Sequence, residues 1–187
     1  MSKRLFDIGL GSILLVIFAV PLLLVAIAIK LTSKGPVLHW SKRVGRNNEL
    51  FLMPKFRSMR VDSPQVATHL LKDPKAYLTP IGHFLRKSSL DELPQLWSVL
   101  TGKMSLVGPR PALFNQDDLV KLRTEVGVEA LRPGVTGWAQ VNGRDELPIP
   151  VKVKYDEYYA KNWSFSLDLK ILFLTLSKVF GAVGVSH

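Results

Sequence analysis

The feature that most restricts the fold of this chain is an apolar run from Ile8 to Ile29, which contains no charged residue. A helix rises about 1.5 Å per residue, so the run is long enough to cross the roughly 30 Å hydrocarbon core of a bilayer. Three structures are compatible with it: a cleaved signal peptide, a straight transmembrane helix, and a helix that enters the membrane, bends and leaves on the same side.

Features within and beside the run favour different structures. Lys3 and Arg4 precede it and Ala26-Ile27-Ala28 resembles a cleavage site, as in a signal peptide. The run is longer than the apolar part of a usual signal peptide, however. Pro21 favours a bent helix, because it has no N–H to bond the Ile17 carbonyl and so permits a sharp kink.

Basic residues flank both ends of the run. The positive-inside rule would place both ends in the cytoplasm, which a single straight span cannot do. We therefore prefer a re-entrant membrane anchor over residues 1–34, followed by one unit over residues 35–187 on the membrane surface. The flanking basic residues are Lys3 and Arg4 on one side, and Lys30, Lys34, Lys42, Arg43 and Arg46 on the other.

The net charge of +10 over 187 residues predicts an anionic partner, such as lipid headgroups, a nucleotide or nucleic acid. The chain contains no cysteine, which excludes disulfides and thiolate metal sites.

The segment from Val37 to Met59 reads as a β-hairpin with a turn near Gly45-Arg46-Asn47-Asn48. Alternation along the strand places Lys55 and Arg57 on the same face, where they could grip a phosphate. The alternative is that this charge is ordinary solvated surface. Basic and aromatic residues on a hairpin are also typical of a nucleic-acid-binding module.

Two adjacent carboxylates, Asp91 and Glu92, lie in the stretch from Ser88 to Leu96. Ser89 and Glu92 fit the S-x-x-E capping pattern, and Pro94 is tolerated only near a helix start. An ionised Asp91 could attack phosphorus while its neighbour holds a divalent metal. The alternative is that both acids are ordinary capping residues.

Two cations flank these carboxylates in the sequence. Helices are predicted from Gln65 to Leu71 and from Thr79-Pro80 to Arg86-Lys87, and the second delivers Arg86 directly before the acidic pair. After a short strand from Met104 to Val107, prolines on both sides of Arg110 make Gly108-Pro109-Arg110-Pro111 a stiff turn. We interpret Arg110 as an anion-binding residue.

Near the C-terminus, the stretch from Gly134 to Arg144 alternates like a strand and ends in an Asn-Gly turn. Gln140 and Arg144 on it could read a base or a diphosphate. Ser166 is predicted to cap a following helix with a wide apolar face. This helix is either a core helix or an interfacial membrane helix, and Trp163 and Phe165 stand at its entrance, where an aromatic belt would lie.

Together, these residues resemble the bacterial sugar transferase family, the small monotopic phosphoglycosyl transferases. The likeness covers nearly the whole chain, and since no further transmembrane domain precedes it, we expect the minimal form of the family. The matching blocks are Lys3-Arg4-Leu5-Phe6-Asp7, Gly35-Pro36-Val37, Lys55-Phe56-Arg57-Ser58-Met59, Leu90-Asp91-Glu92-Leu93-Pro94-Gln95, Met104 to Pro111, Gly134 to Arg144, and Ser166-Leu167-Asp168.

The resemblance implies an α+β, predominantly helical fold. It would consist of an N-terminal re-entrant membrane helix and a small membrane-associated catalytic domain with a β-hairpin and interfacial amphipathic helices. Such a protein would lie in the bacterial inner membrane with its catalytic domain facing the cytoplasm. We leave open whether it forms a homodimer. The family has Ser-Pro at the bend, where this chain has Val20-Pro21, and often a Gln where it has Ser41.

The resemblance also implies a reaction. A sugar 1-phosphate would pass from a UDP-sugar to polyprenol (undecaprenyl) phosphate with release of UMP and help from Mg²⁺. Asp91 would form a covalent aspartyl-phosphosugar intermediate, and Glu92 would share metal binding or acid–base work. From the residues themselves, we predict that the substrate is bound by Lys55, Arg57, Arg86, Arg110, Gln140 and Arg144. We expect no nucleic-acid partner. The alternatives are a glycosyl transferase that releases UDP, a membrane-tethered nucleic-acid-binding module, and a non-catalytic membrane scaffold.

Overall fold

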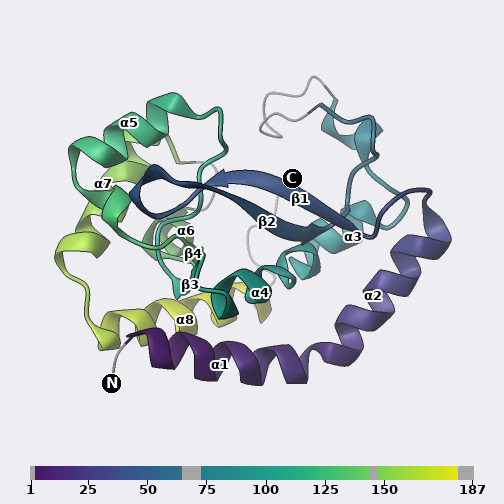
Figure 1. The fold of residues 1–187 in the computed structure, drawn as a ribbon, viewed down its shortest axis with the longest axis horizontal. Helices are drawn as coiled ribbons and strands as arrows, with labels where there is room; N and C mark the ends of the chain where they lie inside the picture. The colour runs from purple at the N-terminus through teal and green to yellow at the C-terminus, as the bar shows by residue number, and fades with distance from the viewer. Residues whose placement is uncertain (1–2, 65–72, 144–146, 181–187) are drawn as a thin grey trace.

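A computed structural model describes residues 3–64, 73–143 and 147–180 (Figure 1). The described fold is mixed α/β and mostly helical, as expected, and the helix predicted over residues 65–71 lies outside it. Its elements are α1 Lys3–Ile17, α2 Ala19–Thr32, β1 Leu38–Val44, η1 Arg46–Asn48, β2 Leu50–Phe56, η3 Pro74–Tyr77, α3 Gly82–Lys87, η4 Leu90–Glu92, α4 Gln95–Leu100, β3 Ser105–Val107, α5 Asp117–Glu125, η5 Val128–Ala130, β4 Gly134–Thr136, α6 Trp138–Gly143, α7 Ile149–Lys161 and α8 Phe165–Phe180.

The apolar run forms two helices that meet at an angle of 59° (Figure 1). The break falls at Phe18. The carbonyl of the preceding Ile17 has no helical hydrogen bond from Pro21, because proline has no N–H. The helical bond from the Leu22 amide to the Phe18 carbonyl then resumes at 2.8 Å. No single helix in the described part of the chain is long and apolar enough to cross a membrane, although the bent pair is when taken together. The bend excludes a straight span over this run.

The predicted hairpin is confirmed. Strands β1 and β2 pair antiparallel, with Leu38 opposite Phe56 and Val44 opposite Leu50. In the turn, Asn47 and Asn48 adopt positive φ angles, which asparagine tolerates better than most residues. The hairpin crosses the middle of the molecule in Figure 1, and β2 packs against α4.

Three predictions about the bounds of strands and helices are wrong. The strand expected from Gly134 to Arg144 is only β4, which pairs parallel with β3; residues from Trp138 to Gly143 form α6. Between β4 and α6 lies Gly137, where an added Cβ would lie 2.0 Å from the Gly108 carbonyl oxygen, so this close contact requires glycine.

The other two errors concern helix starts. Helix α8 is capped by Ser164 rather than Ser166, because Ser164 Oγ accepts the Leu167 amide at 3.2 Å. Helix α3 begins at Gly82 rather than at Pro80. Thr79 Oγ1 does not cap it but donates to the Ser58 carbonyl at 3.2 Å.

The start of α1 is fastened to the rest of the fold. Lys3 pairs with the buried Asp168 of α8, and Arg4 donates to the carbonyls of Val99 and Leu100 at the end of α4. The Asp7 carboxylate accepts the Leu106 amide of β3 at 3.1 Å. Phe6 of α1 also packs edge to face against Phe165 at the start of α8, with ring centroids 4.9 Å apart. The N-terminal helix is therefore part of the core.

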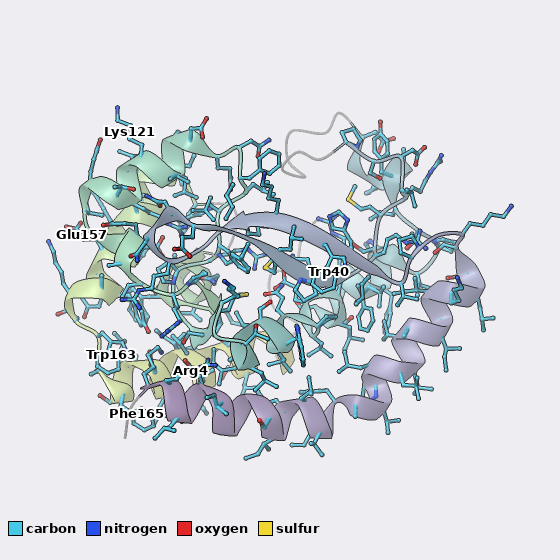
Figure 2. All side chains as sticks on the ribbon, viewed as in Figure 1. Arg4, Trp40, Lys121, Glu157, Trp163 and Phe165 are labelled. Carbon is cyan, nitrogen blue, oxygen red and sulfur yellow. The ribbon has the colours of Figure 1, made fainter. Side chains whose placement is uncertain are left out.

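The outer side of α1, α2 and α8 remains apolar. Figure 2 shows Trp163 and Phe165 near the start of α1, at one end of this surface. Such an extent of exposed apolar side chains is typical of an interaction surface rather than of a surface in water. Its members are Leu5, Ile8, Ile13, Val16, Ile17, Val20, Leu23, Leu24, Ile27, Leu31, Trp163, Phe165, Leu169, Phe173 and Leu176.

Candidate active site

Glu92 lies at the meeting point of three distant segments. Lys55 of β2 donates to Glu92 Oε1 at 2.7 Å. Arg110, from the turn after β3, donates through Nη2 to Oε1 at 2.7 Å and through Nη1 to Oε2 at 3.3 Å. This bidentate contact matches the planar guanidinium to the two oxygens of the carboxylate. The structure thus brings together three of the predicted site residues.

Asp91 is 8% exposed, and its side chain makes no hydrogen bond within the described residues. It lies in η4, the single 3₁₀ turn before α4. The capping box predicted from Ser89 and Glu92 does not form, because Ser89 adopts a left-handed conformation with φ +57° and its side chain makes no cap hydrogen bond. Neither acid therefore acts as an ordinary cap of α4.

The two neighbouring carboxylates are electrostatically different. Burial raises the pKa of Asp91 to about 6, with Glu92 adding to the rise and Lys55 opposing it. Burial also acts to raise the pKa of Glu92, but Arg110 and Lys55 outweigh it and hold that pKa well below its usual range. At neutral pH both are ionised, and only Asp91 retains appreciable basicity.

The turn that carries Arg110 is packed against β4 with no room for side chains. The Gly108 amide bonds the Thr136 carbonyl and the Gly134 amide bonds the Pro109 carbonyl, both at 2.9 Å. An added Cβ at Gly134 would lie 2.1 Å from the Gly108 nitrogen. This close approach explains the glycines on both sides of the contact.

The remaining predicted residues lie in different places. Arg86 Nη1 is 3.6 Å from Met59 Sδ, and its charge lowers the pKa of Asp91, so it belongs near the carboxylates. Gln140 is on α6, and both polar atoms of its side chain are enclosed without a hydrogen-bond partner. Arg144 lies outside the described residues. Contact of these three with a substrate stays a prediction.

Arg57 is not part of the group around Glu92. It is 5% exposed, and its guanidinium donates to the Pro36 carbonyl at 2.6 Å and to Ser33 Oγ at 2.8 Å. Although it shares a strand face with Lys55 in the sequence pattern, it joins the end of β2 to the segment that follows α2. These bonds are structural contacts, and the predicted contact of Arg57 with a substrate stays a prediction.

Sequence reasoning missed two buried charged residues, Arg123 and Asp156. They pair with each other across α5 and α7. The available signal was weak: Asp156 lies three residues after Val153 and three before Tyr159, on the buried side of a helix, where an acid requires a partner.

Asp91 and Glu92 are the candidate protein donors for a metal ion at this site. In the described part of the chain, no group of three or more His, Cys, Asp or Glu side chains could hold a metal ion. Mg²⁺ commonly keeps several waters and takes one or two protein carboxylates together with substrate phosphates. The donor set fits Mg²⁺ in that form, with Asp91 the better placed of the two because both Glu92 oxygens accept bonds from cations.

Comparison with known proteins adds a consistent result. The model of the bacterial sugar transferase family matches residues 1–182. The uncharacterized sugar transferase EpsL of Bacillus subtilis is 42% identical over 187 residues, which cover 99% of this chain and 90% of that protein.

Longer proteins match as well. The undecaprenyl-phosphate glucose phosphotransferase of Komagataeibacter xylinus is 43% identical over 189 residues, 95% of this chain and 36% of that protein. The UDP-glucose:undecaprenyl-phosphate glucose-1-phosphate transferase of Escherichia coli is 40% identical over 189 residues, 96% of this chain and 40% of that protein. The chain thus spans about two fifths of the length of such relatives.

We expect Asp91→Asn to make the metal-free protein more stable at about pH 7.5. The folded-state pKa of Asp91 lies above its ordinary value of 3.8, so the carboxylate destabilises the fold as pH rises from there through about 6. The gain is at most about 3 kcal/mol, and it should shrink as pH falls toward about 4. Thermal unfolding with a chelator measures it, and an unchanged or lower Tm at about pH 7.5 would contradict the raised pKa.

We expect Arg57→Lys to lower the free energy of unfolding by about 1–3 kcal/mol, because lysine cannot reproduce the separate bonds to Ser33 and Pro36. The matched control is Arg60→Lys, since Arg60 pairs with Asp62 on the surface. Denaturant unfolding should separate the two variants. Equal stability would remove the structural role of Arg57.

Proposed function

The chain belongs to the bacterial sugar transferase family, and on that basis we propose that it transfers a sugar 1-phosphate from a UDP-sugar to undecaprenyl phosphate, releasing UMP. The observation that carries this proposal is the unequal carboxylate pair. Glu92 is held by Lys55 and Arg110, and beside it lies the buried Asp91, whose side chain has no hydrogen bond from the described residues. Relatives whose names state undecaprenyl-phosphate phosphotransfer support the substrate class.

In the first step, an Asp91 carboxylate oxygen attacks the phosphorus that bears the sugar. A new Asp91 O–P bond forms and the P–O bond to UMP breaks, so UMP departs with the electron pair. The raised pKa of Asp91 favours this role, because a more basic carboxylate is a better nucleophile while it is still ionised at neutral pH. We expect Lys55, Arg86 and Arg110, whose charges act on Asp91, to stabilise the negative phosphate oxygens during the transfer.

In the second step, a phosphate oxygen of the lipid attacks the same phosphorus and the Asp91 carboxylate leaves. The product is an undecaprenyl diphosphate sugar, and the enzyme returns to its starting state. Separate steps allow UMP to leave before the lipid enters, so one set of cations serves both substrates. When bound, Mg²⁺ would neutralise phosphate charge, held by Asp91, by Glu92 and by the phosphates themselves.

The membrane arrangement belongs to the same proposal. The exposed apolar surface of α1, α2 and α8 would lie in the cytoplasmic leaflet of the inner membrane, with the bent pair as a re-entrant anchor. Residues 1–34 would form this anchor and residues 35–187 the catalytic domain, with α1 packed against α4 and β3. A lipid phosphate could then reach the carboxylates from the membrane surface.

We expect wild-type protein to release UMP in proportion to enzyme in a single-turnover experiment without lipid acceptor. With UDP-sugar labelled in its β-phosphate, the label should remain on the peptide that contains Asp91. Asp91→Asn should release no UMP, since an amide cannot form the acyl phosphate. Asp117→Asn, on the exposed first turn of α5, is the matched control and should behave like wild type.

Other products would point to other mechanisms. Release of UDP would indicate a glycosyl transferase. A lipid requirement for any UMP release, with no label on protein, would indicate direct attack by the lipid phosphate and leave Asp91 as a metal ligand.

We expect cysteines placed at Ser2 and at Lys34 to be shielded equally from a periplasm-only thiol reagent in intact cells. Because the chain contains no cysteine, each single variant reports on one position. Both sites should react once the membrane is permeabilised, which is the control. Labelling of one position alone in intact cells would contradict the re-entrant topology.

A further inference from the structure

A buried ion pair lies directly behind the turn that carries Arg110. Arg123 of α5 is 7% exposed and Asp156 of α7 is 1% exposed. Arg123 donates to Asp156 Oδ2 through Nε at 3.0 Å and through Nη2 at 2.6 Å. Its third donor, Nη1, bonds the main-chain carbonyl oxygen of Arg110 at 2.8 Å.

We propose that Arg123 and Asp156 are positioning residues for the reaction, which hold the main chain of Arg110 so that its guanidinium meets Glu92. This proposal rests on the proposed function. Asp156 orients the Arg123 guanidinium, Arg123 fixes the Arg110 carbonyl, and Arg110 fixes both oxygens of Glu92. The chain of contacts runs from α7 through α5 to the carboxylate beside Asp91.

The carbonyls on both sides of Arg110 are held by other hydrogen bonds. The Pro109 carbonyl accepts the Gly134 amide, and the Pro111 carbonyl accepts Arg43 Nη1 at 3.2 Å. Arg123 supplies the contact at the residue between them, whose side chain reaches Glu92. With the carbonyls of three successive residues held, rotation about the backbone of Arg110 is restricted from both sides.

Stability alone is a weak reason for this ion pair. Desolvation of two buried charges often offsets their attraction, so an apolar pair of similar size would serve a core equally well. An arginine that donates from three nitrogens in fixed directions does something that an apolar residue cannot do. It connects a helix to one carbonyl with fixed geometry, and lysine, as a point charge, would keep the pair without that second contact.

The decisive variant is therefore Arg123→Lys, compared with Arg60→Lys on the surface. Asp156→Asn is compared with Glu157→Gln, since Glu157 pairs with Lys161 and lies on the outer side of α7 (Figure 2). The rate of UMP release in a single turnover should fall about tenfold or more in the Arg123 and Asp156 variants. The two controls should retain the wild-type rate.

A double-mutant cycle distinguishes positioning from a structural role. In an Arg110→Ala background, Arg123→Lys should cause little further loss, because the residue through which it acts is already gone. If the double variant lost the product of the two single-variant rate losses, the proposal would be overturned. A lowered Tm with an unchanged rate in Arg123→Lys would also overturn it.

Hydrogen exchange gives a readout that does not depend on activity. The Gly108 amide is bonded to Thr136, and peptides that span residues 104–113 should exchange faster in Arg123→Lys than in Arg60→Lys. Unchanged exchange would overturn the positioning role. If wild-type protein released no UMP, the proposed function would fail, while this measurement would still decide whether Arg123 holds the turn.

Discussion

The contact between Glu92 and its two cations determines how the other parts of the site must be arranged. Lys55 comes from the hairpin, Glu92 from the turn before α4, and Arg110 from the loop after β3. A carboxylate taken from water is tolerable only when it is paired, so these three segments must meet with correct geometry. The glycine contact between the Arg110 turn and β4, and the packing of β2 on α4, both serve that requirement.

The N-terminal helices are coupled to the same group from two sides. Arg4 bonds the carbonyls that end α4, the helix that begins just after Glu92, whereas Arg57 joins the end of β2 to the segment after α2. Lys55 lies on β2, two residues before Arg57. In the proposed membrane-bound enzyme, these contacts would set the distance between the carboxylates and the membrane surface. This distance matters because the phosphate of a lipid substrate lies at that surface.

Local chemistry explains what the sequence could predict. The hairpin was predictable because Asn47 and Asn48 accept positive φ angles, and the bend because Pro21 lacks an N–H. The family and the acidic pair followed from patterns of neighbouring residues. The partner of Arg57 was not predictable, since strand alternation says which face a side chain shares with Lys55 but not what covers that face. The strand expected through Gln140 ends at Thr136 and α6 begins at Trp138, which the alternation of residue types did not reveal.

The difference between Asp91 and Glu92 arises from where the fixed cations can reach. Consecutive residues in a helical turn point in different directions, so Lys55 and Arg110 can bond one carboxylate and only act on the other through space. The bonded one loses basicity and becomes a fixed negative charge, which itself raises the pKa of its neighbour. Burial is the largest cause of the raised pKa of Asp91, and the charge of Glu92 adds to it. A carboxylate that is ionised near neutral pH, desolvated and still basic is the kind that can form a bond to phosphorus, and here the pairing of Glu92 helps to create it.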